Sequence, residues 1–139
     1  MEVHLSRQNE AVLFEARNAE AASTRIDGAP EIGGVSGGLR PMELLLAALA
    51  SCSAFEVVAI LKKQRQPLQQ LHISARGERV PEGDVRPFQA ITLTFRIQGE
   101  VAPAKAKRAA QLAVEKYCSV RNSLDPGITV NHQVEIQNS

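Results

Sequence analysis

The chain has 139 residues, of which 44% are hydrophobic, and its formal net charge at pH 7 is +1. This length fits one domain, which we predict to span residues 1–139. A charge so close to zero, with no Trp and one Tyr, argues against a nucleic acid or an acidic membrane surface as the partner.

The chain opens on Met1-Glu2-Val3-His4, without the charged and apolar regions of a secretory signal. We therefore expect a cytoplasmic protein, in a compartment where thiols are kept reduced and lasting disulfides are rare.

Short strands are predicted for the N-terminal part. Apolar and polar residues alternate over 3–5 and again over 12–16, and the polar stretch 7–10 supplies a turn between them. This pattern is typical of a β-hairpin. Residues 24–26 are a candidate third strand, which ends at the turn-forming stretch 27–30.

Residues 31–40 contain four glycines and allow two interpretations. One is a loop whose backbone holds a phosphate, and the other is a link where the backbone packs closely. The glycine spacing matches neither a dinucleotide-binding fingerprint nor a P-loop, so the packed link is favoured.

A long helix is predicted for 41–65, because Pro41 suits a first helical position and Pro67 disfavours continuation. From 44 to 61 it is apolar on nearly every face, which is typical of a helix buried all round. A membrane span is the competing interpretation, but Glu56 inside the stretch favours a core helix in a protein without a membrane partner. One small domain covers such a helix poorly, so we expect a homodimer whose second subunit supplies the remaining cover.

The C-terminal half alternates strands and a helix. Residues 70–75 and 91–98 have the period of two of half-buried strands, and 103–117 reads as a helix with a small-residue face that ends at Tyr117. The last strand is predicted over 128–136. The fold class is therefore α+β.

Each of the two predicted helices is associated with a cysteine, Cys52 within the first and Cys118 just after the second. Each thiol is either a small buried hydrophobe or a reactive group. One further helical turn over 119–124 would place Cys118 at a helix N-terminus, which favours a thiolate. The chain has no Cys-x-x-Cys motif, so no metal site is expected. His132 lies in the apolar phase of its strand, which favours a core histidine over a ligand.

A reactive Cys52 needs a nearby cation, and four arginines in or beside predicted loops could provide it: Arg17, Arg25, Arg40 and Arg79. Two acidic residues share the Cys52 helix. Glu56 lies four positions on, hence on the same face, and Glu43 lies nine positions before it, off that face. Each is either a solvated group or one that orients an arginine against the thiolate.

The stretch from Pro41 to Val58 resembles the central-helix motif of the OsmC/Ohr family of cysteine peroxidases, and is closest to the YhfA-like branch. Glu115-Lys116-Tyr117-Cys118-Ser119-Val120 resembles the second cysteine motif of that family, and Gly77-Glu78-Arg79 is similar in a less specific way. The resemblance implies antiparallel sheets wrapped around a long buried helix, in an intertwined homodimer.

The resemblance also implies an antioxidant role in oxidative stress, as a thiol-dependent reductase of organic hydroperoxides. Cys52 would be the peroxidatic thiol and Cys118 the resolving one, a lipoyl-type dithiol would be the reductant, and no bound cofactor would be required. Two alternatives are a non-catalytic module that binds an apolar ligand at the dimer interface and a thiol–disulfide exchanger.

The chain departs from the family pattern at two places. The family has a Glu directly after the helix-opening Pro, where this chain has Met42 followed by Glu43. The family also has an Arg in an early glycine-rich turn, for which Arg17 is the nearest equivalent here.

Overall fold

The computed structural model describes residues 1–137. The chain divides into two compact units, Met1–Leu45 and Leu46–Ser139. Each unit contains one three-stranded sheet, and the long helix α1 (Pro41–Lys63) begins in the first unit and continues in the second. A mixed α+β fold with a long helix confirms the predicted fold class. That residues 1–139 form one domain stays a prediction.

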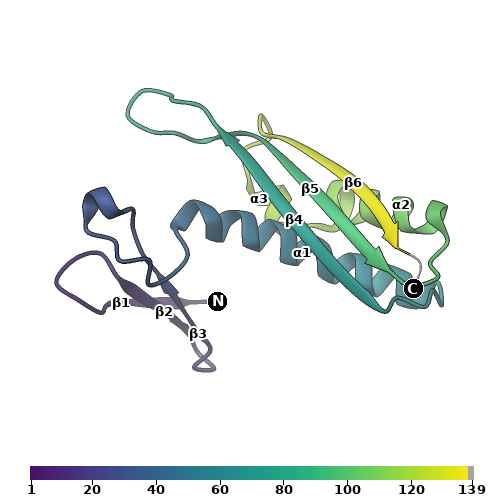
Figure 1. Ribbon diagram of the computed structural model, residues 1–139, viewed down its shortest axis with the longest axis horizontal. Helices are drawn as coiled ribbons and strands as arrows, with labels where there is room; N and C mark the ends of the chain where they lie inside the picture. The colour runs from purple at the N-terminus through teal and green to yellow at the C-terminus, as the bar shows by residue number, and fades with distance from the viewer. Residues whose placement is uncertain (138–139) are drawn as a thin grey trace. The chain divides into compact units, whose positions relative to one another are not determined.

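The first unit is built on the predicted hairpin. Strands β1 (Val3–Arg7), β2 (Phe14–Asn18) and β3 (Ser23–Ile26) form an antiparallel sheet in the order β1-β2-β3, drawn in purple and dark blue in Figure 1. The turn closes where the Gln8 N–H donates to the Leu13 carbonyl at 2.7 Å. The second strand therefore starts two residues later than the alternation predicts.

A buried carboxylate organises the glycine-rich loop, in which a short 3₁₀ helix, η1 (Pro30–Ile32), forms. Asp27 is 2% exposed and accepts hydrogen bonds from the N–H groups of Gly28 at 2.8 Å, Val35 at 2.9 Å and Gly37 at 3.0 Å. These bonds hold the pKa of the Asp27 carboxyl below its ordinary value. Two of the three donors lie in the glycine-rich loop itself and face an internal carboxylate, which supports the interpretation as a packed link.

Because the folded-state pKa of Asp27 is lowered, the carboxylate stabilises the first unit above the unfolded-state pKa, and this stabilisation is lost as pH falls through the folded-state value. We expect Asp27→Asn to melt at a lower temperature than the wild type at neutral pH, with the gap narrowing below about pH 4. Circular dichroism melts across that pH range measure both effects. A gap that does not change with pH would contradict the role of the charge.

Helix α1 begins at Pro41, as predicted, and a side chain closes its first turn. The Glu43 carboxylate accepts a hydrogen bond from the Arg40 backbone N–H at 2.9 Å, which satisfies a donor that the helix leaves open. The helix ends at Lys63, two residues before the predicted end, and Arg65 adopts a left-handed conformation with φ 54°.

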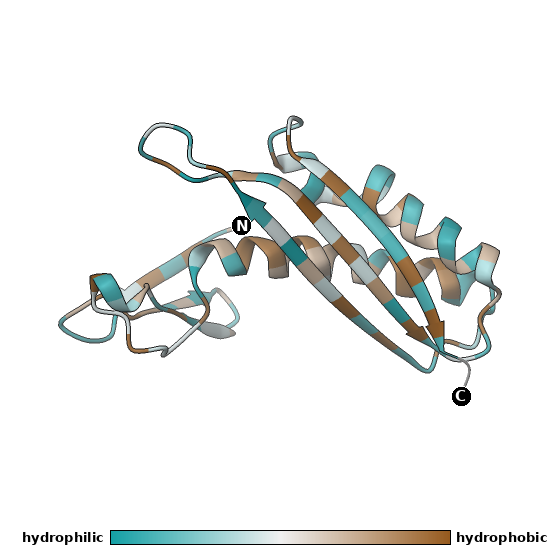
Figure 2. Ribbon diagram, turned by 45° about the horizontal axis from the view of Figure 1, so that its top comes forward, coloured by the Kyte–Doolittle hydropathy of each residue, from teal (hydrophilic) through white to brown (hydrophobic). Residues whose placement is uncertain are grey.

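The single chain buries only part of α1, as expected for a helix that one small domain covers poorly, and burial of its other faces by a second subunit stays a prediction. Its buried residues form one stripe at a spacing of four, namely Leu49, Ser53, Val57 and Leu61. Apolar residues lie on other faces too, with Phe55 72% and Val58 44% exposed, and Figure 2 shows hydrophobic colour along most of the helix. Among residues 1–137, α1 is the one helix long and apolar enough to cross a membrane by length and composition, and 22% of that window is buried. The single chain therefore buries one stripe of α1 and leaves apolar residues on its other faces exposed.

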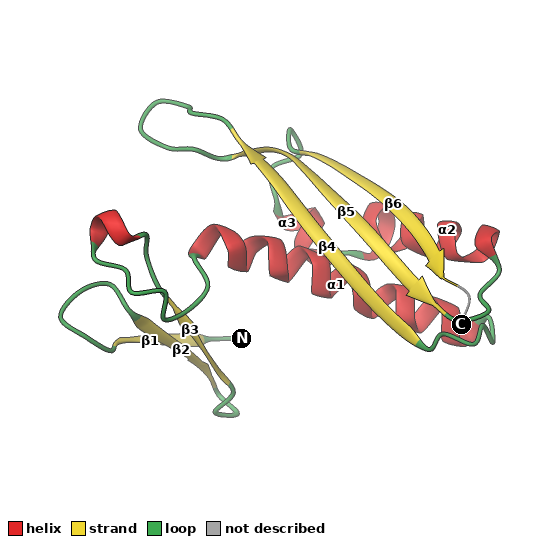
Figure 3. Ribbon diagram, in the orientation of Figure 1, coloured by secondary structure: helices red, strands yellow, loops and turns green. Residues whose placement is uncertain are grey.

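The second sheet provides the main core. Strands β4 (Gln70–Arg79), β5 (Phe88–Gln98) and β6 (Thr129–Gln137) lie in the order β4-β5-β6. The alternation predicted for β5 is confirmed, since its inward residues are at most 1% exposed: Ile91, Leu93, Phe95 and Ile97. The β4–β5 pair is antiparallel but β5–β6 is parallel, which corrects the expectation of purely antiparallel sheets. Figure 3 shows α1 and α2 on the same face of this sheet.

The second predicted helix changes its hydrogen-bonding pattern before it ends. Helix α2 (Pro103–Leu112) is followed by a π-helical turn, η2 (Ala113–Tyr117), and then by the short helix α3 (Ser119–Ser123). The small-residue face predicted for α2 is buried, with Ala106, Ala109, Ala110 and Ala113 all 0% exposed. Tyr117, expected on that face, is 47% exposed, because the wider π turn shifts the phase of the residues that follow.

Candidate redox site

The structure brings together the two thiols, which are distant in the sequence. Cys52 is half-buried on α1, next to the buried stripe, and Cys118 is 3% exposed in the loop between η2 and α3. Neither forms a disulfide. Burial is the main cause that raises the pKa of the Cys118 thiol, and the neighbouring Cys52 thiol raises it further. The two sulfur atoms therefore lie within interaction range of each other, inside the second unit.

Local structure fixes the position of Cys118. The π turn ends at Tyr117, and Cys118 then takes extended backbone angles, φ −80° and ψ 107°, as the N-cap of α3. Its sulfur accepts the Arg121 backbone N–H at 3.3 Å. The predicted helical turn after Cys118 is thus present, but burial outweighs the donated hydrogen bond, so the pKa of this thiol lies above its ordinary value.

A third polar side chain reaches this site. Ser53 follows Cys52 on α1 and is 0% exposed. The nearby Ser53 hydroxyl lowers the pKa of the Cys118 thiol, against the larger effect of burial. Yet Ser53 Oγ forms no well-aligned hydrogen bond with any group among residues 1–137. The hydroxyl therefore lies beside the Cys118 sulfur but is not hydrogen-bonded to it. The sequence carries a signal for this residue, because Ser53 is the one polar position in the four-residue spacing from Leu49 to Leu61.

The two predicted carboxylates lie in different units. Glu43 is an exposed residue of the first unit, and its side chain is used in capping α1. Glu56 is half-buried one turn after Cys52 on the same face of α1, and it takes part in none of the ion pairs formed within residues 1–137. Their roles toward the thiols stay predictions.

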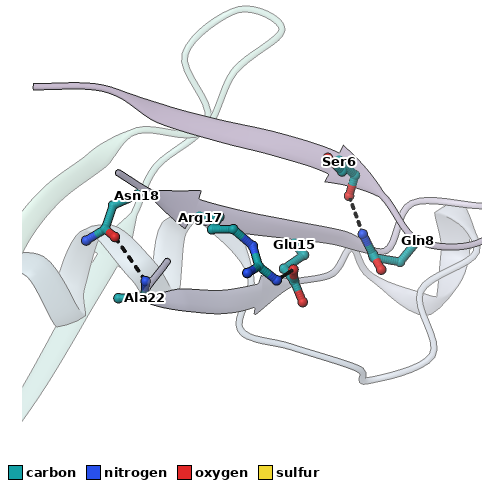
Figure 4. Close-up of polar contacts among 6 residues, drawn as sticks. All are labelled: Ser6, Gln8, Glu15, Arg17, Asn18 and Ala22. Atoms are coloured by element: carbon teal, nitrogen blue, oxygen red, sulfur yellow. Dashed lines mark hydrogen bonds and ion pairs between the residues drawn. The ribbon is translucent and has the colours of Figure 1, made fainter. Parts of the chain in front are cut away.

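Two of the predicted arginines, Arg17 and Arg79, have other partners. In the first unit, the Arg17 guanidinium pairs with Glu15 at 2.7 Å, as Figure 4 shows, and the same view shows the Gln8–Ser6 and Asn18–Ala22 bonds that hold the strand ends. In the second unit, Arg79 Nε donates to the Arg86 carbonyl at 2.7 Å, within the hairpin between β4 and β5.

Arg121 supplies the thiol site with its backbone N–H and not with its charge. Its Nη2 donates to the Ile128 carbonyl at 2.8 Å, on the turn before β6. Within residues 1–137, no guanidinium hydrogen-bonds to either thiol. Activation of Cys52 by Arg17 or Arg79 therefore stays a prediction.

An apolar groove of about 600 Å³ lies on another face of α1, between the helix and the start of β4. Its walls include Ala54, Phe55 and Val58 from the helix and Leu71 and Ile73 from the strand. Neither cysteine lines this groove, so it is a feature separate from the thiol pair.

The residues described by the structure contain no cluster of metal-ligating side chains. His132 on β6 faces the Glu115 carboxylate at 3.6 Å and is half-buried, which fits the interpretation as a core histidine with a polar partner.

Residues 33–133 match the family model described as OsmC-like protein. The chain belongs to this family of OsmC-like proteins.

Among individual proteins, the chain is similar to protein YhfA of Escherichia coli K12, with 38% identity over 69% of this chain and 72% of YhfA. Its structure is similar to that of a hypothetical protein from Aquifex aeolicus, with a TM-score of 0.84, 30% identity and coverage of 99% and 96% of the two chains. The fold also resembles that of the organic hydroperoxide resistance protein OsmC from Legionella pneumophila, with a TM-score of 0.72, 15% identity and coverage of 97% of each chain.

Proposed function

We propose that the protein is a thiol-dependent peroxidase that reduces organic hydroperoxides through Cys52 and Cys118. The observation that carries this proposal is the meeting of the two free thiols, one from the middle of α1 and one from the N-cap of α3. Two neighbouring thiols that differ in exposure are what a peroxidatic and a resolving cysteine require.

The catalytic cycle requires only the two cysteine sulfurs of the protein and an external dithiol. The Cys52 thiolate attacks the terminal peroxide oxygen, the O–O bond breaks, and an alcohol leaves while Cys52 becomes a sulfenic acid. The Cys118 thiol then condenses with it, releasing water and forming a disulfide. A dithiol of the lipoyl type reduces that disulfide by exchange and becomes a cyclic disulfide itself.

The difference in burial between the two cysteines supports the proposed order of their reactions. Cys52 is the more accessible sulfur and so the one that a hydroperoxide can reach. Cys118 is buried, and because its pKa is raised it is held as a thiol, the form that supplies the proton for the water released on condensation. The name of the Legionella protein as an organic hydroperoxide resistance protein supports the same substrate class.

A second candidate function is the binding of an apolar ligand without catalysis. The open groove beside Phe55 favours it, because its walls are mostly apolar and about 600 Å³ is the size of a small-molecule site. In that case the thiols would be inert.

Steady-state consumption of cumene hydroperoxide, with a lipoyl-type dithiol as donor, separates the proposals. If the protein is a peroxidase, we expect turnover that depends on both the hydroperoxide and the dithiol. A protein that exchanges thiols with disulfides but is indifferent to peroxide would instead be an exchanger. A protein that leaves the hydroperoxide untouched while binding an apolar fluorescent probe would favour the ligand-binding alternative.

We also propose that the working form is a cytoplasmic homodimer in which a second subunit covers the outer face of α1. Phe55, 72% exposed in the single chain, is a large aromatic that such an interface would bury. Light scattering is expected to give twice the chain mass of 15.1 kDa, and Phe55→Asp is expected to shift the protein to monomer. Val85→Asp, at an exposed position between β4 and β5, is the matched control. A monomeric wild type would contradict this proposal.

A further inference from the structure

Ser53 is a buried polar group whose presence the packing does not explain. It occupies the inward stripe of α1 between Leu49 and Val57, both 0% exposed, in a row where an apolar residue would be the stable choice. A buried hydroxyl without a hydrogen bond is destabilising, so such groups are uncommon and each calls for a cause.

The surroundings of the hydroxyl point to that cause. Ser53 Oγ has no hydrogen-bond partner among residues 1–137, yet it lies beside the Cys118 sulfur. A thiol is a weak acceptor, whereas a thiolate is a charged and therefore much stronger one. The hydroxyl is thus positioned for a state of Cys118 that the reduced, protonated protein does not populate.

We propose that the Ser53 hydroxyl is a positioning residue that donates a hydrogen bond to the Cys118 thiolate when this thiolate is expelled from the Cys52–Cys118 disulfide. This inference rests on the proposed function. It adds a residue to the site and assigns it to the reductive half of the cycle.

The direction of the exchange follows from exposure. Cys118 is 3% exposed and Cys52 is half-buried, so an external thiolate reaches the Cys52 sulfur first. Its attack forms a mixed disulfide with Cys52, the original S–S bond breaks, and the electron pair stays on Cys118 as a thiolate. The second thiol of the donor then attacks the mixed disulfide and releases Cys52, and the Cys118 thiolate takes up a proton from water.

The leaving sulfur needs stabilisation, because burial alone makes its negative charge costly. The Arg121 backbone N–H already donates to this sulfur at 3.3 Å, and the Ser53 hydroxyl is the second donor that the proposal adds. Exchange is faster when the leaving thiolate is more stable, so the hydroxyl speeds reduction of the disulfide without touching the peroxide. The attack of Cys52 on a hydroperoxide involves a different sulfur and does not need this bond.

The first arm of the test titrates the Cys118 thiolate by ultraviolet absorbance in a Cys52→Ala background, which leaves one thiol in the chain. Ser53→Ala is expected to raise the pKa of Cys118 by about 0.5–1 unit, the shift that corresponds to one hydrogen bond. Ser123→Ala is the matched control, since that exposed α3 hydroxyl donates to the Ser119 carbonyl at 2.9 Å and is expected to shift nothing.

The second arm measures the two half-reactions separately in the chain with both cysteines. Ser53→Ala is expected to slow reduction of the preformed disulfide by dithiol about 3–10-fold, while oxidation of the reduced protein by cumene hydroperoxide changes less than about twofold. If the alanine variant does not fold, Ser53→Thr and Ser53→Val form a pair of equal shape that differs in the hydroxyl. The threonine variant is expected to retain the rate that the valine variant loses.

An unchanged Cys118 pKa in Ser53→Ala, or an equal loss in both half-reactions, would overturn the inference. The titration requires no peroxidase activity, so the two proposals fail separately. A wild type that does not consume hydroperoxide would remove the proposed function and with it the role of Ser53 in a cycle. If the wild type consumes hydroperoxide but Ser53→Ala leaves the pKa of Cys118 unchanged, only the role of Ser53 is removed.

Discussion

Replacing Cys52 with serine is expected to lower the rate of organic hydroperoxide consumption by at least about 100-fold. A serine hydroxyl is not ionised near neutral pH and is a far weaker nucleophile toward a peroxide oxygen than a thiolate. Cys52 is half-buried on α1, and the smaller oxygen atom fits the same space, so the fold and the melting temperature are expected to change little. The measurement is the steady-state assay with a lipoyl-type dithiol, run on both proteins at equal concentration.

The control for Cys52→Ser is the circular dichroism melt of the same sample. A variant that folds like the wild type and still consumes hydroperoxide at a comparable rate would show that Cys52 is not the peroxidatic thiol. Since Cys118 is 3% exposed, we do not expect it to replace Cys52 in this reaction.

Replacing Cys118 with serine is expected to separate the two halves of the cycle. Cys52 can still react with one equivalent of hydroperoxide, but its sulfenic acid then has no neighbouring thiol with which to condense. The oxidised variant should therefore accumulate a sulfenic acid that a cyclic 1,3-dione traps, and its turnover with the dithiol should fall by about tenfold or more.

Mass spectrometry of the dione-treated Cys118→Ser protein detects the adduct on Cys52, and the wild type treated in the same way is the comparison. In the wild type the disulfide forms first and the adduct is expected to be scarce. Wild-type turnover in Cys118→Ser, with no adduct, would contradict a resolving role for Cys118.

Local sequence patterns predict much of the fold. The alternation from Ile91 to Ile97 predicts β5 because a period of two puts every second residue on the core side, and those residues are buried. The start of α1 is equally direct, since Pro41 suits the first turn and Glu43 reaches back to close it. These features depend on residues that are neighbours in the sequence.

Other features depend on tertiary packing, which local patterns do not encode. The alternation in β6 predicts a strand but not its direction, and the parallel pairing with β5 depends on how the chain returns through α2 and α3. The π turn that ends at Tyr117 has no distinctive composition, yet it decides that Tyr117 is exposed and Cys118 buried.

For the candidate site too, local sequence predicts some features and tertiary packing determines the others. Both cysteines could be singled out from the sequence, because a thiol in each helix-associated segment is a pattern that chemistry can use. Their proximity could not, since it depends on the packing of α1 against the segment that follows η2. The sequence suggested Arg17 and Arg79, whereas the structure adds Ser53 and the backbone of Arg121 beside the sulfur.

The most direct test of the central claim is the mass of the reduced protein after one equivalent of an organic hydroperoxide, followed by peptide mapping without reductant. The account predicts a loss of two hydrogens and a cross-link between Cys52 and Cys118 of the same chain. Oxidation of Cys52 alone, a cross-link only between separate chains, or two thiols left unchanged would contradict it.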